Sequence, residues 1–155
     1  MQYEKLGTSE LNVSRICMGC MGFGDAANGQ HTWTIDEEHS RAIIRRGLEL
    51  GVNFFDTAIG YQNGTSEQYL GRALKDFTSR EQVVVATKFL PRTNEIEAGI
   101  TGQQHIEGML NKSLENLGMD YVDLYIYHMW DYRTSIYDIL DWSYVKKKYK
   151  LNMPF

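Results

Sequence analysis

Residues 52–58 read Val52-Asn53-Phe54-Phe55-Asp56-Thr57-Ala58, an apolar run that ends on a carboxylate and a hydroxyl. The segment Val52–Phe55 is short and apolar and predicts a buried strand. Gly51 directly before it ends a segment of helical apolar spacing, which begins at a predicted capping box of Thr34 and Glu37. The sequence therefore predicts a helix that leads into a strand with polar residues at its end.

The same alternation repeats along the chain. We expect helices over 66–75, 103–117 and from near Thr134, and strands over 83–87 and 121–127. A hairpin is predicted over 2–16, because Gly7-Thr8-Ser9-Glu10 separates two short segments. Strands that alternate with helices imply a parallel sheet, since parallel neighbours need crossover connections.

About four strand and helix units follow the hairpin, whereas a complete (β/α)8 barrel typically needs about 250 residues. We therefore predict an α/β fold of the TIM-barrel type that is incomplete. The single domain 1–155 would consist of the hairpin 2–16, the β/α units 17–140 and a divergent tail 141–155. A doubly wound sheet is less favoured, because the turn 19–24 leads into a long loop and not into a tight phosphate-binding turn.

Charge and hydropathy limit the classes of binding partner that we expect. The chain has 16 basic and 20 acidic residues, a net charge of -4, so we do not expect a nucleic-acid partner. The basic run Lys146–Lys150 is interpreted as a solvated end. The sequence has neither the pattern of a secretory signal nor an apolar stretch long enough to span a membrane, and we expect a cytoplasmic protein with no membrane partner.

Cys17 and Cys20 are spaced as C-x-x-C, which is compatible with a redox pair or half of a zinc site. A zinc site needs further ligands at matching spacing, and the sequence supplies no second pair. The preferred interpretation is a buried strand over Ile16–Met21, in which cysteine packs as a small apolar side chain. No metal is expected.

Polar side chains end three successive predicted strands. Asp56, with Tyr61 five residues later, ends the first, Lys88 the second and His128 the third. Each has an ordinary structural reading, as a turn cap, a lysine that reaches solvent or a histidine bonded to backbone. In a parallel barrel the working residues stand at the carboxyl ends of the strands, so their joint occurrence predicts one shared site.

These strand ends belong to a longer ordered series. Asp56-Thr57-Ala58-Ile59-Gly60-Tyr61 is followed by Ser66-Glu67-x-x-Leu70-Gly71-x-Ala73-Leu74, Thr87-Lys88, and Ser113-Leu114-x-x-Leu117-x-x-Asp120-Tyr121-x-Asp123-Leu124-Tyr125-x-x-His128. In order and spacing the series resembles the aldo-keto reductase family, and the resemblance covers about residues 2–140.

The resemblance implies an NADPH-dependent oxidoreductase that reduces aldehydes and ketones to alcohols. Tyr61 matches the proton donor of the family. A phenol is a poor acid near neutrality, with an ordinary pKa of about 10, and the charge of Lys88 would favour the phenolate. Asp56 would hold Lys88 in place, and His128 would orient and polarise the carbonyl of a small-molecule substrate.

The resemblance also implies where the cofactor binds. Cys20, Met21 and Asp56 would touch the nicotinamide ribose region of NADPH, whereas the pocket for the 2'-phosphate comes from later strands of the family. Trp33 and Trp130 are expected either to line the substrate pocket or to pack as structural aromatics.

The last part of the sequence departs from the family. Ser135 stands where the family places proline, and 142–150 only loosely resembles the end of the fourth helix. The chain stops where a fifth strand is expected, so we expect a truncated barrel, as a frameshift, an early stop or a gene fragment would each produce. Its exposed half-barrel face would favour self-association.

Two function classes remain open at this point. One is a carbonyl reductase, and the other is a non-catalytic aldo-keto reductase-like fragment with an interaction or regulatory role, of which channel subunits are the family's example. A metal-dependent barrel hydrolase is disfavoured, because the first strand lacks a His-x-His pair.

Overall fold

The computed structural model describes residues 1–92 and 99–132. The predicted helix from Thr134, the departure at Ser135 and the tail 141–155 lie outside the described residues.

A four-stranded parallel sheet forms the centre of the structure. Its strands pair in chain order, β3-β4-β5-β6. They are β3 (Cys17–Gly19), β4 (Phe54–Asp56), β5 (Val84–Phe89) and β6 (Leu124–Tyr127). Each strand therefore lies beside the strand that follows it in the sequence.

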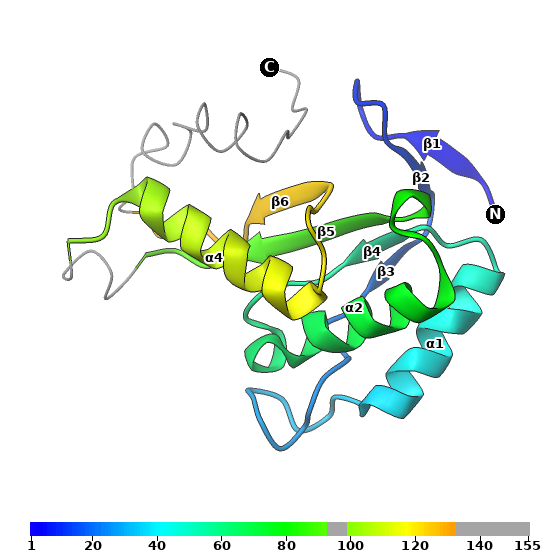
Figure 1. The fold of residues 1–155 in the computed structure, drawn as a ribbon, viewed down its shortest axis with the longest axis horizontal. Helices are drawn as coiled ribbons and strands as arrows, with labels where there is room; N and C mark the ends of the chain where they lie inside the picture. The colour runs from blue at the N-terminus through cyan, green and yellow to red at the C-terminus, as the bar shows by residue number, and fades with distance from the viewer. Residues whose placement is uncertain (93–98, 133–155) are drawn as a thin grey trace.

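Three helices supply the crossovers, and all three lie on the same side of the sheet (Figure 1). They are α1 (Glu37–Glu49), α2 (Thr65–Phe77) and α4 (Gly102–Leu117), with short 3-10 turns η1 (Tyr61–Gly64) and η2 (Arg80–Gln82) before α2 and β5. A doubly wound sheet would carry helices on both faces and reverse its strand order. The sequential order and one-sided helices confirm the barrel-type α/β fold, of which the described part is an open segment.

The core fills the space between the sheet and the helices. Phe55 and Val85 are register partners on this side of the sheet, and both are completely buried. Alternation along β5 places Thr87 on the same side, where its hydroxyl donates to the buried carboxylate of Glu67 at 2.6 Å. Leu70 and Leu110 bring α2 and α4 into the same apolar cluster.

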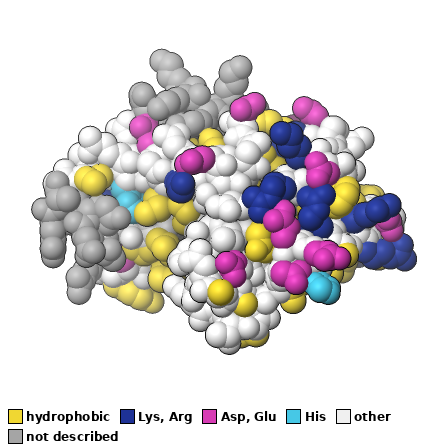
Figure 2. All heavy atoms as spheres, turned by 60° about the horizontal axis from the view of Figure 1, so that its bottom comes forward, with side chains coloured by type: hydrophobic (Ala, Val, Ile, Leu, Met, Phe, Trp, Pro, Cys, Tyr) yellow, Lys and Arg dark blue, Asp and Glu magenta, His cyan; other side chains and the backbone are white. Residues whose placement is uncertain are grey.

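The outer surface of the helices carries basic and acidic side chains interspersed with each other (Figure 2). Arg72 of α2 makes a two-pronged ion pair with Glu37 of α1, and Arg41 of α1 makes a single contact with Asp76 of α2. Such exposed pairs fix the relative position of the helices more than they stabilise the fold.

Helix ends follow local sequence signals, although one prediction was wrong. The expected capping box of Thr34 and Glu37 does not form, because Asp36 is the N-cap of α1 and accepts from the amide of His39. Glu37 instead pairs with Arg72. The helix α4 does begin with a capping box, made by Thr101 and Gln104, and ends at the left-handed Gly118 as predicted.

The predicted hairpin is confirmed, with β1 (Tyr3–Lys5) and β2 (Asn12–Ser14) paired antiparallel. It is tied to the sheet by Asn53, whose side chain accepts from the amide of Ser14 and donates to the carbonyl of Asn12. The expectation of a buried strand over 16–21 was wrong for most of its length. Ile16 is 59% exposed and Cys17 is exposed, because β3 is an edge strand of the described sheet.

Within the described ranges, none of the helices is both long enough and apolar enough to cross a membrane.

Candidate active site

Register alone places three of the predicted site residues on one face of the sheet, opposite the helices. Asp56 pairs with Ala86, and Lys88 follows two residues later on the same face of β5. Lys88 pairs with Ile126, and His128 follows two residues after Ile126. The amide of His128 donates to the carbonyl of Phe89 at 3.0 Å, so the strand pairing continues to this residue.

Lys88 is the centre of the site. Its ammonium donates to Asp56 Oδ1 at 2.5 Å, to the carbonyl oxygen of Thr57 at 2.8 Å and to Tyr61 Oη at 3.1 Å. These three acceptors use all three N–H donors of an ammonium group. The side chain is 13% exposed, so the charge is held largely away from water by a carboxylate, a carbonyl and a phenol.

Tyr61 reaches Lys88 because the chain turns tightly after β4. The amide of Ile59 donates to the carbonyl of Lys88 at 3.2 Å, and the amide of Tyr61 donates to the carbonyl of Ala58 at 3.1 Å. The turn η1 then continues through Gln62 and Asn63, both with left-handed backbone angles. This turn bends the chain back so that the tyrosine ring lies above the end of the sheet.

The surroundings of Lys88 keep it charged. Burial by itself lowers the pKa of the ammonium, but the hydrogen bonds to Asp56 and Tyr61 and the negative charge of Asp56 outweigh burial and raise the pKa above its ordinary value. The lysine is therefore a permanent cation at neutral pH. A cation in hydrogen-bond contact with a phenol stabilises the phenolate that forms when the phenol gives up its proton.

His128 completes the group. Its ring stands edge-on to Tyr61, with ring centroids 5.5 Å apart and an interplanar angle of 80°. Burial, followed by the charge of Lys88, lowers the pKa of the imidazole below its ordinary value, so the ring is neutral near pH 7. Its Nδ1 atom is buried and has no hydrogen-bond partner among the described residues. The buried Nδ1 atom is out of reach of a ligand, so a ligand of the neutral ring would bind at its other nitrogen, Nε2.

The three residues expected to contact the cofactor differ in how exposed they are to solvent. Met21 is exposed just beyond β3, and the carboxylate of Asp56 is 29% exposed although it binds Lys88. Cys20 is completely buried, its amide donates to the carbonyl of Asp56 and its carbonyl accepts from the hydroxyl of Ser66. The donor set of this edge fits the nicotinamide ribose end of NADPH, since a partly exposed carboxylate accepts from ribose hydroxyls and a thioether packs against a flat ring.

The two cysteines do not form a reactive pair in the structure, where both are free thiols. Burial and the charge of Asp56 raise the pKa of Cys17 to about 11, and burial raises the pKa of Cys20 further. Reactive cysteines have lowered pKa values, so this environment does not favour a redox role. Among the described residues, no three His, Cys, Asp or Glu side chains are grouped so that they could hold a metal ion.

Two contributors to the site were not predicted from the sequence. The carbonyl of Thr57 is a third acceptor for Lys88, and the side chain of Gln62 binds the loop after β3. A backbone carbonyl carries no sequence signal. Gln62 stands directly after the predicted proton donor in the quoted motif, and that position was the only clue. Trp33 and Trp130 are both exposed, and their expected place in the substrate pocket stays a prediction.

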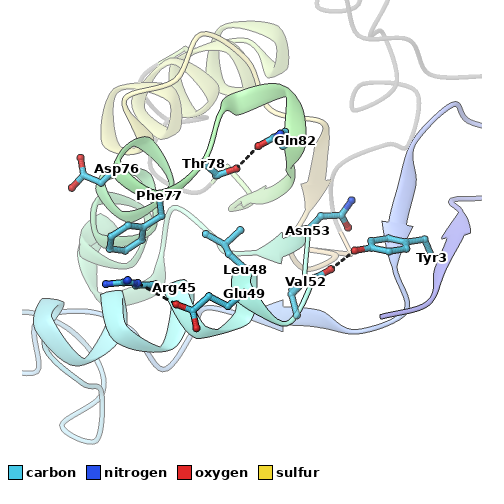
Figure 3. A pocket seen from close by; sticks show the side chains of 11 residues that line it. Tyr3, Arg45, Leu48, Glu49, Val52, Asn53, Asp76, Phe77, Thr78 and Gln82 are labelled. Atoms are coloured by element: carbon cyan, nitrogen blue, oxygen red, sulfur yellow. Dashed lines mark hydrogen bonds and ion pairs between the residues drawn. The ribbon is translucent and has the colours of Figure 1, made fainter.

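A separate pocket of about 710 Å³ lies at the opposite end of the sheet (Figure 3). Val52 and Asn53, which precede β4, and Gln82, which precedes β5, place it at the amino ends of the strands. Tyr3 closes one side by donating its hydroxyl to the carbonyl of Gly51. The pocket therefore contains none of the four predicted catalytic side chains.

Comparison with known proteins agrees with this geometry. The sequence profile described as the aldo/keto reductase family matches residues 15–150. Norsolorinic acid reductase B of Dothistroma septosporum is 32% identical over 90% of this chain and 38% of its own length. A probable voltage-gated potassium channel subunit beta of Oryza sativa subsp. japonica is 36% identical over 88% of this chain and 40% of its own length.

The crystallographic neighbour most useful for the fold is an aldo-keto reductase of Bacillus halodurans in its holo form. It is 32% identical, with a TM-score of 0.78, over 97% of this chain and 48% of that protein. The chain thus spans about two fifths of the length of the curated relatives quoted and about half of the solved neighbour. From the profile, the relatives and the fold together, the chain belongs to the aldo/keto reductase family.

Proposed function

We propose that the chain carries the proton-donating part of an NADPH-dependent carbonyl reductase site, with Asp56, Tyr61, Lys88 and His128 as its catalytic residues. The single observation that carries this proposal is the contact of the Lys88 ammonium with Tyr61 Oη on one side and Asp56 Oδ1 on the other. A lysine that is buried against a phenol adds little to the stability of the fold, whereas its charge would stabilise the phenolate that forms when the phenol donates its proton.

The chemistry follows from the contacts. The hydride that the carbonyl carbon needs is what NADPH supplies when it is bound. The proposed contacts are Met21 and Asp56, and Cys20, which is completely buried, holds this edge through its backbone bonds to Asp56 and Ser66. The Oη–H bond of Tyr61 breaks as a new O–H bond forms on the carbonyl oxygen of the substrate. Lys88 stabilises the phenolate that remains, and Asp56 fixes Lys88. His128 hydrogen bonds the same carbonyl oxygen and orients it.

NADPH binding tests this proposal directly. We expect the fluorescence of NADPH to change in a saturable way when it is titrated with the purified chain. Asp56→Asn should weaken the binding, whereas Asp76→Asn, which changes a carboxylate at the other end of the sheet, should leave it unchanged. No saturable change at high protein concentration would remove the reductase proposal for this chain.

A second function has its own support. One relative is named as a channel subunit, which favours a non-catalytic role in interaction or regulation for a chain of this fold. Turnover separates the two proposals. Oxidation of NADPH in the presence of 4-nitrobenzaldehyde, a reactive small-molecule carbonyl, supports the enzyme, whereas NADPH binding without turnover supports the regulatory role.

Self-association through the open side of the barrel segment is also part of the proposal. Ile126 and Met129, on and just beyond the last described strand, are both exposed apolar side chains. Light scattering over a range of concentrations should show a mass above that of one chain, and a constant monomer mass would contradict this. The cytoplasmic location predicted from the sequence is checked by cell fractionation.

A further inference from the structure

The segment between β3 and α1 is fastened to the turn that follows Tyr61. Figure 1 shows this segment beside the turn before α2, at the lower edge of the molecule. The fastening side chain is Gln62, which is 1% exposed although glutamine is usually a surface residue. The amide of Asp25 adds a bond to Thr65 Oγ1 at 3.0 Å, and Asn63 donates to Asn28 Oδ1 at 3.3 Å.

The amide group of Gln62 is fully used by this segment. Its oxygen accepts from the backbone amide of His31 at 2.9 Å. Its nitrogen lies 2.9 Å from the carbonyl oxygen of Asp25, 2.8 Å from that of His31 and 3.1 Å from Thr34 Oγ1. Three acceptors share two N–H donors, so the orientation of the amide is fixed. A carboxylate of the same shape would be repelled by the same three oxygens.

The fit is steric as well as polar. A Cβ atom added at Gly29 would lie 2.5 Å from Gln62 Oε1 and 2.7 Å from its Cα. A Cβ at Gly24 would lie 2.6 Å from Gln62 Cβ, and Gly24 has a φ of 139° that disfavours a side chain in any case. The segment therefore wraps around Gln62 with glycine at the two points of closest approach.

Gln62 is itself held in a rarely populated backbone conformation, with φ 47° and ψ 49°. Such angles persist only where the surrounding structure determines them, and they cluster at functional sites. We call the hydrogen bonds of the Gln62 amide to Asp25, His31 and Thr34 the grip. Because Gln62 directly follows Tyr61, the grip links the proposed proton donor to the segment between β3 and α1. That segment carries His31 and Trp33, whose rings stack with centroids 4.8 Å apart.

The stacked pair lies beside the residue that follows Met21, one of the expected cofactor contacts. Trp33 Cζ3 would lie 3.8 Å from a Cβ atom at Gly22, which directly follows the exposed Met21. The indole is 59% exposed, so most of its surface is open to a ligand. A large flat apolar surface of this kind favours contact with an aromatic ring.

We propose that Gln62 is a positioning residue that sets substrate specificity. It holds Trp33 at a fixed distance from Tyr61, so that the site accepts carbonyl compounds with a flat aromatic ring. The role as a substrate wall rests on the proposed reductase function. The hydrogen bonds of Gln62 to the segment do not depend on that function, so the position of the segment and the binding of the aromatic ring are tested separately.

The grip is tested by hydrogen exchange on the full chain. Gln62→Ala removes the amide, and Gln62→Glu keeps its shape but replaces the donor nitrogen by an oxygen. Gln68→Ala is the matched control, because Gln68 lies on the same helix and contacts only Asn116, at 3.5 Å. Gln62→Ala should exchange the amide of His31 about tenfold faster, because this amide loses its acceptor. Gln62→Glu should have a similar effect, because its second oxygen is repelled by the three oxygens that Nε2 contacts. Exchange in α2 and β5 should be unchanged.

The wall is tested by ligand binding. With Trp130→Phe and Trp142→Phe, Trp33 is the only tryptophan, and quenching of its fluorescence reports binding of 4-nitrobenzaldehyde. Gln62→Ala should raise the Kd for this probe about tenfold and leave the Kd of a small aliphatic aldehyde within about twofold. Where turnover is measurable, KM for the aromatic probe should rise with a smaller change in kcat.

Gly29→Ala gives an independent test, because it displaces the segment without changing Gln62. It should reproduce both the faster exchange and the weaker probe binding. An unchanged exchange rate of the His31 amide in Gln62→Ala would show that Gln62 does not hold the segment. Faster exchange with an unchanged Kd for 4-nitrobenzaldehyde would show that Trp33 does not contact the aromatic ring. Absence of NADPH binding with both effects present would instead remove the reductase and leave Gln62 as a device for binding aromatic ligands.

Discussion

Two largely buried ion pairs stand at opposite ends of β5. Arg80, just before the strand, donates to Asp123 Oδ2 at 2.6 Å, and the two side chains are 16% and 12% exposed. Lys88, near the end of the strand, pairs with Asp56 at similar burial. By charge and accessibility the two pairs look alike, yet the groups around them differ in kind.

The first pair is surrounded by backbone. Asp123 also accepts from the amide of Val85, and Arg80 donates to the carbonyls of Val83 and Tyr121 while its guanidinium lies 3.9 Å from the ring centre of Tyr121. The additional hydrogen-bond partners are backbone amides and carbonyls, which do not exchange protons with a ligand, and Tyr121 adds only the face of its ring. The Arg80–Asp123 pair therefore fastens β5 to the segment before β6.

The second pair has a phenol hydroxyl among its hydrogen-bond partners, and its carboxylate is 29% exposed. The hydroxyl of Tyr61 lies 3.1 Å from Lys88 Nζ, and it is the group that we propose as the proton donor. An ion pair is therefore a candidate for catalysis when a third group beside it, here the hydroxyl of Tyr61, can exchange a proton. Ion pairing alone, which the two ends of the strand share, does not distinguish structure from chemistry.

The largest effect is expected for Tyr61→Phe. The variant keeps the ring but removes the hydroxyl, so the rate of 4-nitrobenzaldehyde reduction should fall by about 10³, within the usual range for loss of a general acid. NADPH binding and the free energy of unfolding should change little. Turnover that survives this change would remove Tyr61 as the proton donor.

Asp123→Ala should produce the largest loss of stability. It leaves the charge of Arg80 and the amide of Val85 without their acceptor, which should lower the free energy of unfolding by about 2–3 kcal/mol. Asp120→Ala, an exposed neighbour in the same motif, should change it by less than about 0.5 kcal/mol. Urea unfolding measures both, and equal effects would contradict the structural role of the pair.

The pH dependence of stability should reveal His128. Because its pKa is lowered in the folded chain, its contribution is fully present above the ordinary pKa of about 6.5 and is lost as pH falls through the lowered value. His128→Gln should therefore flatten the loss of stability below about pH 7.

His39 is the opposite case and serves as the control. Hydrogen bonding to Asp36 raises its pKa, so its contribution is present below the ordinary pKa and is lost as pH rises through the raised value. His39→Gln should leave the acid slope in place. An unchanged acid slope in His128→Gln would show that the ring is not shielded from water.

The smallest effect concerns the thiol of Cys17, whose pKa is raised by burial and by Asp56 and lowered by Lys88. Asp56→Asn should speed alkylation of Cys17 by iodoacetamide about threefold, and Lys88→Met should slow it, as a change of about half a pKa unit would do. Cys20, which is completely buried, is the internal reference. Identical rates in both variants would mean that the ion pair does not influence this edge.

Local sequence signals predicted the elements well. The strands and helices alternate as expected, Gly118 ends α4, and Asp56, Lys88 and His128 lie on one face because strand periodicity and pairing place them there. Errors arose where several local candidates compete or where burial depends on neighbours. Asp36 and Thr34 are both good caps, and only the path of the loop chose Asp36.

The sequence by itself determined the order of β/α units, the barrel-type sheet and the polar strand ends, because hydrophobic period and turn residues act over a few positions. Only the tertiary structure decided that Lys88 joins Asp56 to Tyr61, that Cys20 is buried while Cys17 is exposed, and that Gln62 grips a segment about thirty residues earlier. Those contacts join residues far apart in the chain. Their geometry is set by strand register and by the left-handed turn, and neither produces a recognisable pattern in the amino-acid sequence.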